Sequence, residues 1–282
     1  MQKVLVAGAS GYLGRYLIKE LKKQGYSIRA LVRNSKKIED LKEHIDEIFE
    51  DEVTKPDTLA GVCEDIDFVI SSIGITRQKD GLTYMDVDYQ GNKNLLEQAK
   101  KNNISKFIYI SVINAHLMKD LKMIRAKELF VSELKESGLD YVVVRPTGFF
   151  SDMLEFLKMA QKGRVSLFGN GQNKINPIHG ADLAKVCVES LDSQNKEINV
   201  GGPEIFTFRE IGELAFKVLD RKVKISTFPL WMIQIILPLI RIFFSSKTYG
   251  PLEFMMAIMT MDVIGDLYGK EKLCDCFKQN VG

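Results

Sequence analysis

Three glycines spaced three residues apart follow the first apolar segment of the chain. Gly8, Gly11 and Gly14 come directly after Val4–Ala7, and a helical pattern begins at once. A glycine-rich turn between a strand and a helix lets backbone N–H groups approach phosphate oxygens, and the helix N-terminus adds partial positive charge. The spacing is Gly-x-x-Gly-x-x-Gly rather than the Gly-x-Gly-x-x-Gly of many dehydrogenases. The residues predicted to hold a dinucleotide pyrophosphate here are Gly8, Ser10, Gly11, Tyr12, Leu13 and Gly14.

Basic side chains stand where the adenosine ribose of such a dinucleotide would lie. No Asp or Glu occurs from Leu21 through Ile38, whereas an NAD-preferring site usually carries a carboxylate near the end of the second strand. Arg33 closes that strand instead, and Arg15 directly follows the glycine motif. Because a guanidinium can hold a 2′-phosphate with paired charge-assisted hydrogen bonds, we expect NADP rather than NAD.

The elements that must position these residues alternate along the first half of the chain. Apolar runs typical of strands occur at Val4–Ala7, Ile28–Val32, Ile45–Phe49, Phe68–Ser72, Phe107–Ser111 and Tyr141–Val144. Amphipathic runs typical of helices occur at Tyr12–Lys23, Tyr89–Lys101 and Ile124–Ser137. This alternation predicts an α/β fold with a parallel sheet covered on both faces. Right-handed crossovers make it a doubly wound Rossmann sheet that binds its ligand at the carboxyl ends of the strands.

Two further strand ends would face the same ligand. The third apolar run is followed by Asp51, which is placed to contact the adenine. The fourth run leads into Ser72, Ile73 and Gly74, where small residues let the backbone approach a cofactor. Ordinary loop chemistry is the alternative for both tracts.

The pattern changes after Arg145-Pro146. Glycines then separate shorter elements, at Gly163, Gly169, Gly171, Gly180, Gly201 and Gly202. We predict an NADP-binding Rossmann domain over residues 1–150 and a smaller substrate-binding lobe over residues 151–282. The lobe is expected to interleave partly with the first domain, without a flexible linker.

Composition excludes several classes of function. A formal net charge of +2 gives no concentrated basic face, so nucleic acid is not an expected partner. The four cysteines are scattered and no secretory signal opens the chain, which predicts a reducing cytoplasm. Cys274 and Cys276 are too close for the usual zinc knuckle and have no second pair, so no metal is expected.

Residues 1–200 resemble the short-chain dehydrogenase/reductase superfamily in its atypical branch. The matching stretches are Gly8–Gly14, Asp86–Asn92, Phe107–Ser111, Ala126–Glu128, Ser137–Tyr141, Arg145–Phe150, Asn176–His179 and Asp182–Ala184. The remaining third is similar, more loosely, to divinyl chlorophyllide 8-vinyl-reductases. Isoflavone-reductase-like proteins, complex I accessory subunits and nitrogen-regulator-like cofactor sensors share the first two thirds. The resemblance implies an NADP cofactor and adds Pro146, Thr147 and Gly148 to the residues expected beside it. It also places His179 at a strand-to-helix junction outside the cleft, as a structural residue.

In that superfamily a Tyr-x-x-x-Lys pair on one helix face carries out the proton transfer, and Lys127 matches the Lys. Met123 stands four residues earlier, and a thioether cannot donate a proton. Three alternatives follow. Lys127 itself acts as the general acid, which requires burial and the cofactor to pull its pKa toward neutrality. Ser111, at the end of the fifth strand, supplies the hydroxyl instead. In the third, Lys127 only holds the ribose, and the protein binds NADP without turnover as an assembly factor or redox sensor.

The last third of the chain is rich in apolar residues. Four methionines occur in the eight residues 254–261, and methionine suits an adaptable pocket for a large apolar ligand. The residues predicted to contact a lipophilic substrate are Phe149, Met153, Met255 and Met256. A subdomain core or a dimer contact is the alternative.

Residues 228–246 form the other apolar stretch. Gln234, Pro238 and Arg241 interrupt it, so it falls short of a membrane span. Shallow membrane association through 228–246 is a third alternative, with Trp231 at the interface and Arg241 on lipid headgroups.

The sequence therefore predicts an NADPH-dependent reductase that transfers hydride to a bulky apolar substrate, such as an enone, a quinone or a vinyl-bearing tetrapyrrole. It is expected in the cytoplasm, with or without a peripheral membrane contact. The alternative function is a non-catalytic NADP-binding regulator or assembly factor. The sequence indicates no oligomeric state.

Overall fold

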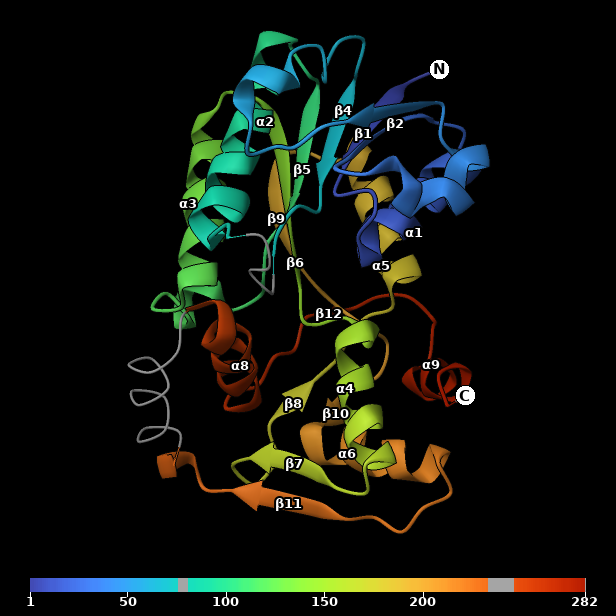
Figure 1. Ribbon diagram of the computed structural model, residues 1–282, viewed down its shortest axis with the longest axis vertical. Helices are drawn as coiled ribbons and strands as arrows, with labels where there is room; N and C mark the ends of the chain where they lie inside the picture. Colours follow the sequence, from blue (N-terminus) through green and yellow to red (C-terminus); the bar gives the residue numbers. More distant parts are fainter. Residues whose placement is uncertain (76–80, 233–245, 282) are drawn as a thin grey trace.

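The computed structural model describes residues 1–75, 81–232 and 246–281. Eight of the described strands build a parallel sheet with the strand order β12-β9-β6-β5-β4-β1-β2-β3 (Figure 1). Its strands are β1 (Lys3–Ala7), β2 (Ser27–Val32), β3 (Glu47–Glu50), β4 (Phe68–Ser71), β5 (Lys106–Ile110), β6 (Asp140–Pro146), β9 (Lys196–Gly201) and β12 (Asp266–Leu267). Every paired neighbour in this sheet runs parallel. The predicted doubly wound Rossmann sheet is therefore confirmed.

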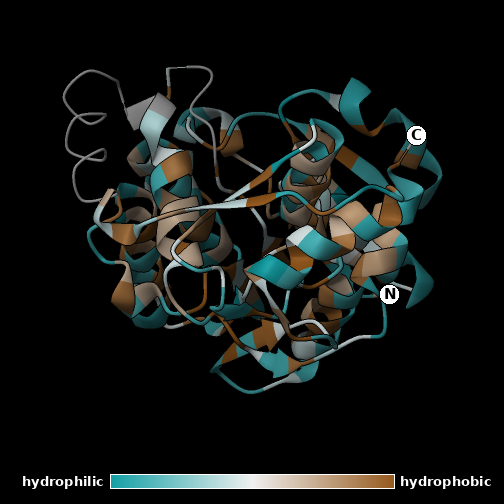
Figure 2. Ribbon diagram, turned by 90° about the horizontal axis from the view of Figure 1, so that it is seen from below, coloured by the Kyte–Doolittle hydropathy of each residue, from teal (hydrophilic) through white to brown (hydrophobic). Residues whose placement is uncertain are grey.

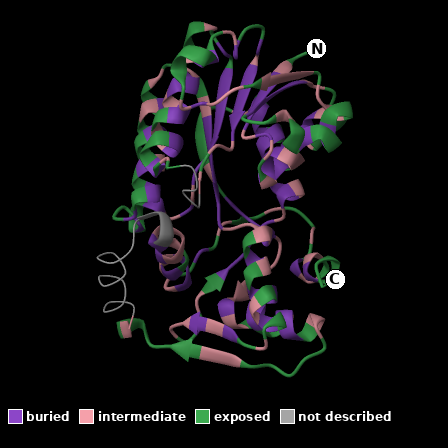
Figure 3. Ribbon diagram, in the orientation of Figure 1, coloured by how far each residue is buried: buried purple, intermediate pink, exposed green. Residues whose placement is uncertain are grey.

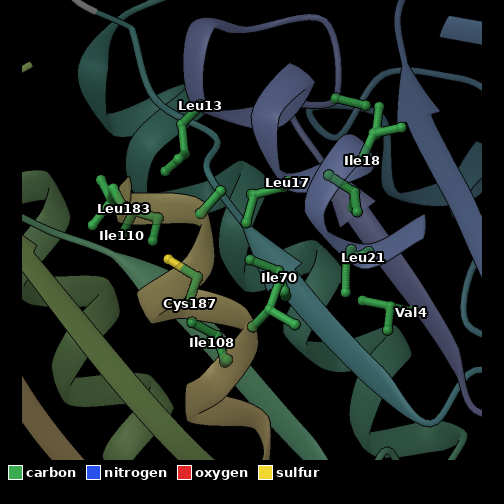
Figure 4. Packing of buried hydrophobic residues seen from close by; sticks show 14 of the residues in the cluster. Val4, Leu13, Leu17, Ile18, Leu21, Ile70, Ile108, Ile110, Leu183 and Cys187 are labelled. Carbon is green, nitrogen blue, oxygen red and sulfur yellow. The ribbon is translucent and has the colours of Figure 1, made fainter. Parts of the chain in front are cut away.

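Helices cover both faces of the sheet. α1 (Tyr12–Lys23) and α5 (Gly180–Glu189) lie on one face, while α2 (Asn92–Lys101) and α3 (Lys122–Glu136) lie on the other (Figure 1). Each face has its own apolar core. On the α1 side, Leu17 and Leu21 pack with Ile70 of β4 and Cys187 of α5, as Figure 4 shows. Figure 3 shows that the central strands are almost wholly buried, which explains their near-continuous apolar sequences.

Several predicted boundaries shift by a few residues. The third strand begins at Glu47 rather than Ile45, because Ile45 ends the 3-10 helix η1 (Ser35–His44) and donates its N–H to Lys42. The helix predicted to begin at Tyr89 starts earlier, as the π-helix η3 (Met85–Gly91), and continues as α2. Asp88 lies within η3 and is fully buried. Single-turn π segments often occur at functional sites.

A second lobe lies at the carboxyl edge of the sheet. It contains the parallel pair β7 (Val165–Phe168) and β11 (Ile225–Phe228), and the antiparallel pair β8 (Lys174–Ile175) and β10 (Phe206–Thr207). Its helices are α4 (Phe150–Gln161), α6 (Phe208–Val218), α8 (Ser246–Met259) and α9 (Leu273–Gln279). Figure 2 shows hydrophobic and hydrophilic residues interspersed along the helices of the molecule. The short 3-10 helices are η2 (Pro56–Leu59), η4 (Ala115–Leu117) and η5 (Ser190–Asp192).

The chain crosses between the two parts more than once. After α4 and β8 it returns to the large sheet to form α5 and β9, and after α8 it returns again as β12. Asn176 joins the crossings: its buried amide donates to the carbonyls of Gly202 and Gly265 and accepts from the N–H of Gly265. Along the described ranges, no helix is long and apolar enough to cross a membrane.

Candidate functional site

The glycine turn is the first part of the site. Gly8 follows β1 with φ at +84°, a value that favours glycine, and its carbonyl accepts the N–H of Gly11 at 2.9 Å. A Cβ on Gly14 would lie 2.2 Å from that carbonyl oxygen, and a Cβ on Gly8 would lie 2.8 Å from Oγ of Ser72. The turn can therefore close only with glycine at these positions, and it meets the end of β4. Since the chain continues from β1 toward β2 on one side and β4 lies on the other, this is the switch point where doubly wound sheets bind ligands.

The N-terminus of α1 is arranged for an anion. Its N-cap is Gly11, which offers no side-chain cap, and its first turn carries no acidic residue. Backbone N–H groups of Tyr12 and Leu13 thus remain for phosphate oxygens. The side chain of Tyr12 connects α1 to α5, because its hydroxyl accepts the N–H of Gly180 at 3.0 Å. These features fit a dinucleotide pyrophosphate. Ser10 lies half-buried in the same turn.

The two arginines predicted for the 2′-phosphate differ in their surroundings. Arg15 is ion-paired with Asp40 and donates to the carbonyl of Lys37 at 2.9 Å, so its guanidinium is tied to η1. Arg33 follows β2 with its side chain 52% exposed, and its guanidinium lies 4.0 Å from Glu52. The exposed side chain of Arg33 is accessible to a phosphate at this edge of the sheet.

Other predicted cofactor residues end neighbouring strands. Asp51 follows β3, accepts the N–H of Glu52 and is hydrogen-bonded by Thr58. Beyond β4, Ser72 donates to the carbonyl of Ala7 at 3.2 Å, and Ile73 and Gly74 continue along the sheet edge. At the end of β6 come Pro146, Thr147 and Gly148; Thr147 donates to Asn176 at 2.6 Å, and Gly148 accepts the N–H of Ile178. All of these residues lie at the carboxyl edge of the sheet.

Lys127 reaches the same edge from α3. Its Nζ lies 2.9 Å from Oδ1 of Asp88 and 3.5 Å from the hydroxyl of Tyr109. Burial lowers the pKa of Lys127, but Asp88 and Tyr109 raise it by more, so the net pKa lies above its ordinary value. This direction is opposite to the one that a proton donor working near neutral pH requires. The alternative in which Lys127 is the general acid thus requires the bound cofactor to lower this pKa, and the catalytic role of Lys127 stays a prediction.

Ser111 is not directed at Lys127. Its hydroxyl donates to Glu128 at 2.7 Å, within a network in which Arg145 holds Glu128 through two hydrogen bonds of 2.8 Å and contacts Glu197 at 2.6 Å. Ser111 is 3% exposed. Its hydroxyl is thus committed to joining β5, β6 and α3, and the catalytic role of Ser111 stays a prediction.

The four residues predicted to contact the substrate belong to α4, its N-cap and α8. Phe149 is the N-cap of α4 and packs edge-on against Tyr12, and Met153 is buried in the core of the second lobe. On α8, Met256 is buried while Met255 is 37% exposed. Their role in substrate binding stays a prediction.

A small cavity lies beside Met123 instead. It is lined by Tyr84, Leu121, Lys122, Met123, Tyr249, Gly250, Glu253 and Phe254. Its space is about that of one water molecule. A bulky substrate that enters here must therefore displace side chains of α8.

Sequence reasoning missed the partners of Lys127 and correctly placed His179. Asp88 and Tyr109 are both fully buried beside the ammonium. Asp88 stands next to the buried Val87 in the segment that leads into α2. A carboxylate at such a position is rarely buried without a partner, and this signal could have drawn attention to Asp88. His179 caps α5 by accepting the N–H of Ala181, as expected of a structural histidine.

Comparison with known proteins decides the family. Residues 8–194, which run from the glycine turn through α5, match the NAD(P)H-binding family. The chain belongs to this family. The resemblance to NAD(P)-dependent reductases is confirmed, and the cofactor class is NAD(P)H.

Relatives of two kinds share this fold. The photosystem II assembly factor Ycf39 of Synechocystis sp. is 28% identical over 245 residues, which cover 86% of this chain and 75% of that protein. Divinyl chlorophyllide a 8-vinyl-reductase of Arabidopsis thaliana is 30% identical over 258 residues, which cover 83% of this chain and 61% of that protein. One relative is an assembly factor and the other an enzyme.

Solved structures agree on the fold. The NADPH-dependent quinone oxidoreductase QOR2 of Escherichia coli, solved with NADPH, has a TM-score of 0.80 at 16% identity, covering 99% of this chain and 100% of that one. A nucleoside-diphosphate-sugar epimerase of Staphylococcus aureus has a TM-score of 0.72 at 18% identity, covering 100% and 95%. The chain is thus an NAD(P)H-binding, reductase-like protein.

Proposed function

We propose that this protein is an NADPH-dependent reductase that acts on a bulky apolar substrate of the enone, quinone or vinyl-tetrapyrrole type. When bound, NADPH supplies a hydride. The turn Gly8–Gly14 and the N-terminus of α1 would hold the pyrophosphate, and Arg33 would hold the 2′-phosphate. Lys127 would donate to the ribose hydroxyls of the nicotinamide half.

The position of Met123 supports the apolar substrate most directly. It lies one helical turn before Lys127 in α3, so its side chain and the Lys127 ammonium are neighbours along one helix face. Leu121 and Phe254 line the cavity beside it, together with the polar or charged side chains of Tyr84, Lys122, Tyr249 and Glu253. A flexible, polarisable thioether next to the ammonium suits an extended hydrophobic molecule rather than a sugar or a small hydroxy acid.

A non-catalytic regulator or assembly factor is the second candidate. Two observations favour it: Lys127 is held by Asp88, and the Ser111 hydroxyl is committed to Glu128. Neither group is poised to give a proton to a substrate. The similarity to an assembly factor supports the same candidate.

Oxidation of NADPH by the purified protein separates the two candidates. The reductase proposal expects substrate-dependent loss of NADPH absorbance with at least one quinone, enone or vinyl-bearing tetrapyrrole. The Lys127→Ala variant should lose that turnover. Tight NADPH binding without turnover across the three substrate classes would favour the regulator.

A further inference from the structure

Asp88 and Lys127 form a buried ion pair between two elements that are far apart in the sequence. Asp88 lies in η3 with its side chain fully buried, and Lys127 lies in α3 with 12% of its side chain exposed. The second carboxylate oxygen of Asp88 accepts the N–H of Ile75 at 3.2 Å. The carboxylate therefore connects the ammonium to the loop that follows β4.

A second polar residue fixes η3 in place. The buried amide of Asn92 donates to the backbone carbonyl of Asp88 at 2.9 Å, and its oxygen accepts the hydroxyl of Ser71 at 2.6 Å. Gly74 passes directly over the ion pair: a Cβ there would lie 2.6 Å from Oδ1 of Asp88 and 2.8 Å from Nζ of Lys127. Backbone and carboxylate together leave the ammonium little freedom to move.

The charged and titratable groups around Lys127 come from three elements. Asp88 approaches from η3 and Tyr109 from β5, while Glu128 of α3 itself is bound by Arg145. Asp88 is thus the carboxylate in contact with Nζ among the described residues. Without it, Lys127 would be a buried ammonium whose closest polar partner is a neutral hydroxyl, and burial would favour its neutral form.

We propose that Asp88 is the positioning residue of the cofactor site, which keeps Lys127 charged and aimed at the nicotinamide ribose. The proposal rests on NAD(P)H binding but not on turnover, so it holds for a reductase and for a regulator alike. It also implies that Lys127 anchors the cofactor and does not donate the proton.

The test is the nearly isosteric variant Asp88→Asn. NADH and NADPH binding are measured by calorimetry at about pH 7.5 and about pH 9.5, above the range where the 2′-phosphate itself titrates. The wild type should bind equally at both values. Asp88→Asn should bind about tenfold more weakly at the higher pH, because Lys127 then loses the proton that makes a charged hydrogen bond.

Thermal unfolding without cofactor gives an independent test. Here a higher pH should reduce the defect of Asp88→Asn, whereas in nucleotide binding a higher pH should increase it. In the wild type the folded-state pKa of Lys127 is raised, so its contribution to stability is complete below the unfolded pKa of about 10.4. In Asp88→Asn the folded-state pKa falls below the unfolded value, and the folded protein then binds fewer protons than the unfolded chain. Its stability should rise with pH, so its deficit in Tm relative to the wild type should shrink between about pH 7.5 and about pH 9.5.

Asp86→Asn is the matched control, because it removes a carboxylate from the same helical segment. Asp86 is exposed, and its carboxylate accepts the N–H and the hydroxyl of Thr83. Its loss should therefore leave the pH dependence of binding and of Tm as in the wild type. If Asp88→Asn does not fold, Lys127→Met serves instead. It leaves Asp88 buried without its counter-charge, so its deficit in Tm should shrink as the pH falls from about 7 to about 5.

Two results would overturn the proposal. One is an Asp88→Asn protein whose binding of both nucleotides stays independent of pH, since Lys127 would then not depend on Asp88 for its charge. The other is a deficit in Tm that is equal at both pH values, which indicates a packing role alone. Absence of nucleotide binding in the wild type would be a separate result, because it would contradict the cofactor site and not only Asp88.

Discussion

Replacing Arg33 with alanine should change the choice between the two nicotinamide cofactors. Arg33 follows β2 with its side chain 52% exposed, and its guanidinium lies 4.0 Å from Glu52. Exposed ion pairs contribute about 0–1 kcal/mol to stability, so the contact with Glu52 adds little to the fold. The loss should therefore appear in cofactor binding rather than in folding.

The size of the effect follows from the exposure of the side chain. A hydrogen bond to a charged group contributes about 1.5–3 kcal/mol. Because the Arg33 side chain is 52% exposed, screening by solvent places its contribution near the lower end of that range. We expect NADPH to bind about tenfold more weakly to Arg33→Ala, corresponding to about 1.4 kcal/mol, and NADH to bind as before.

Calorimetric titration with both nucleotides measures this difference directly. Lys36→Ala is the matched control, because Lys36 is an exposed cation three residues further along and should affect NADPH binding far less. Arg15→Ala should weaken NADPH binding less than Arg33→Ala, since Arg15 is already paired with Asp40. Equal losses for NADPH and NADH in Arg33→Ala would refute the assignment of the 2′-phosphate to Arg33.

Three further predictions concern the turn, the polar network and the apolar surface. Gly14→Ala should abolish NADPH binding, because its Cβ would lie 2.2 Å from the Gly8 carbonyl oxygen. Gly25→Ala is the control: a Cβ there has open space around it, so the substitution should cost about 1 kcal/mol of stability and leave NADPH binding intact. Titration with NADPH and thermal unfolding distinguish the two variants. Ser111→Ala should lower the free energy of unfolding in urea by about 1–3 kcal/mol and leave kcat largely unchanged; a lost kcat with normal stability would make Ser111 the proton donor. Trp231 is 60% exposed, as a residue that inserts into a membrane surface would be. Membrane contact through residues 228–246 predicts that Trp231→Ser reduces flotation of the protein with anionic vesicles and that the control Leu129→Ser on α3 does not. Equal flotation of both variants would contradict the membrane contact.

The sheet and the glycine turn could be predicted because their signals are local. Val4–Ala7 is apolar throughout, as a strand buried on both faces must be, and Gly8 and Gly14 follow at the spacing of a tight turn. Similarly, the absence of an acid after β2 could be read directly from the sequence. These features depend on neighbouring residues only.

The partners of Lys127 could not be predicted, because they come from distant parts of the chain. The pairing of Asp88 with Lys127 depends on how η3 packs against α3, and Tyr109 joins them from β5. The ion pair of Arg15 with Asp40 likewise forms only because η1 packs beside α1. Most of residues 228–246 lies outside the described residues, so the predicted roles of Pro238 and Arg241 stay predictions.

Reduction of an apolar substrate by NADPH is the reaction that we propose for this NAD(P)H-binding protein. The most direct measurement is the decrease in NADPH absorbance when the purified protein meets quinones, enones and vinyl-bearing tetrapyrroles, with NADH measured in parallel. We expect turnover of at least one apolar substrate with a preference for NADPH, and the loss of this turnover in Lys127→Ala. Tight binding of NADPH without turnover of any of these substrates would contradict the reductase and favour the regulator.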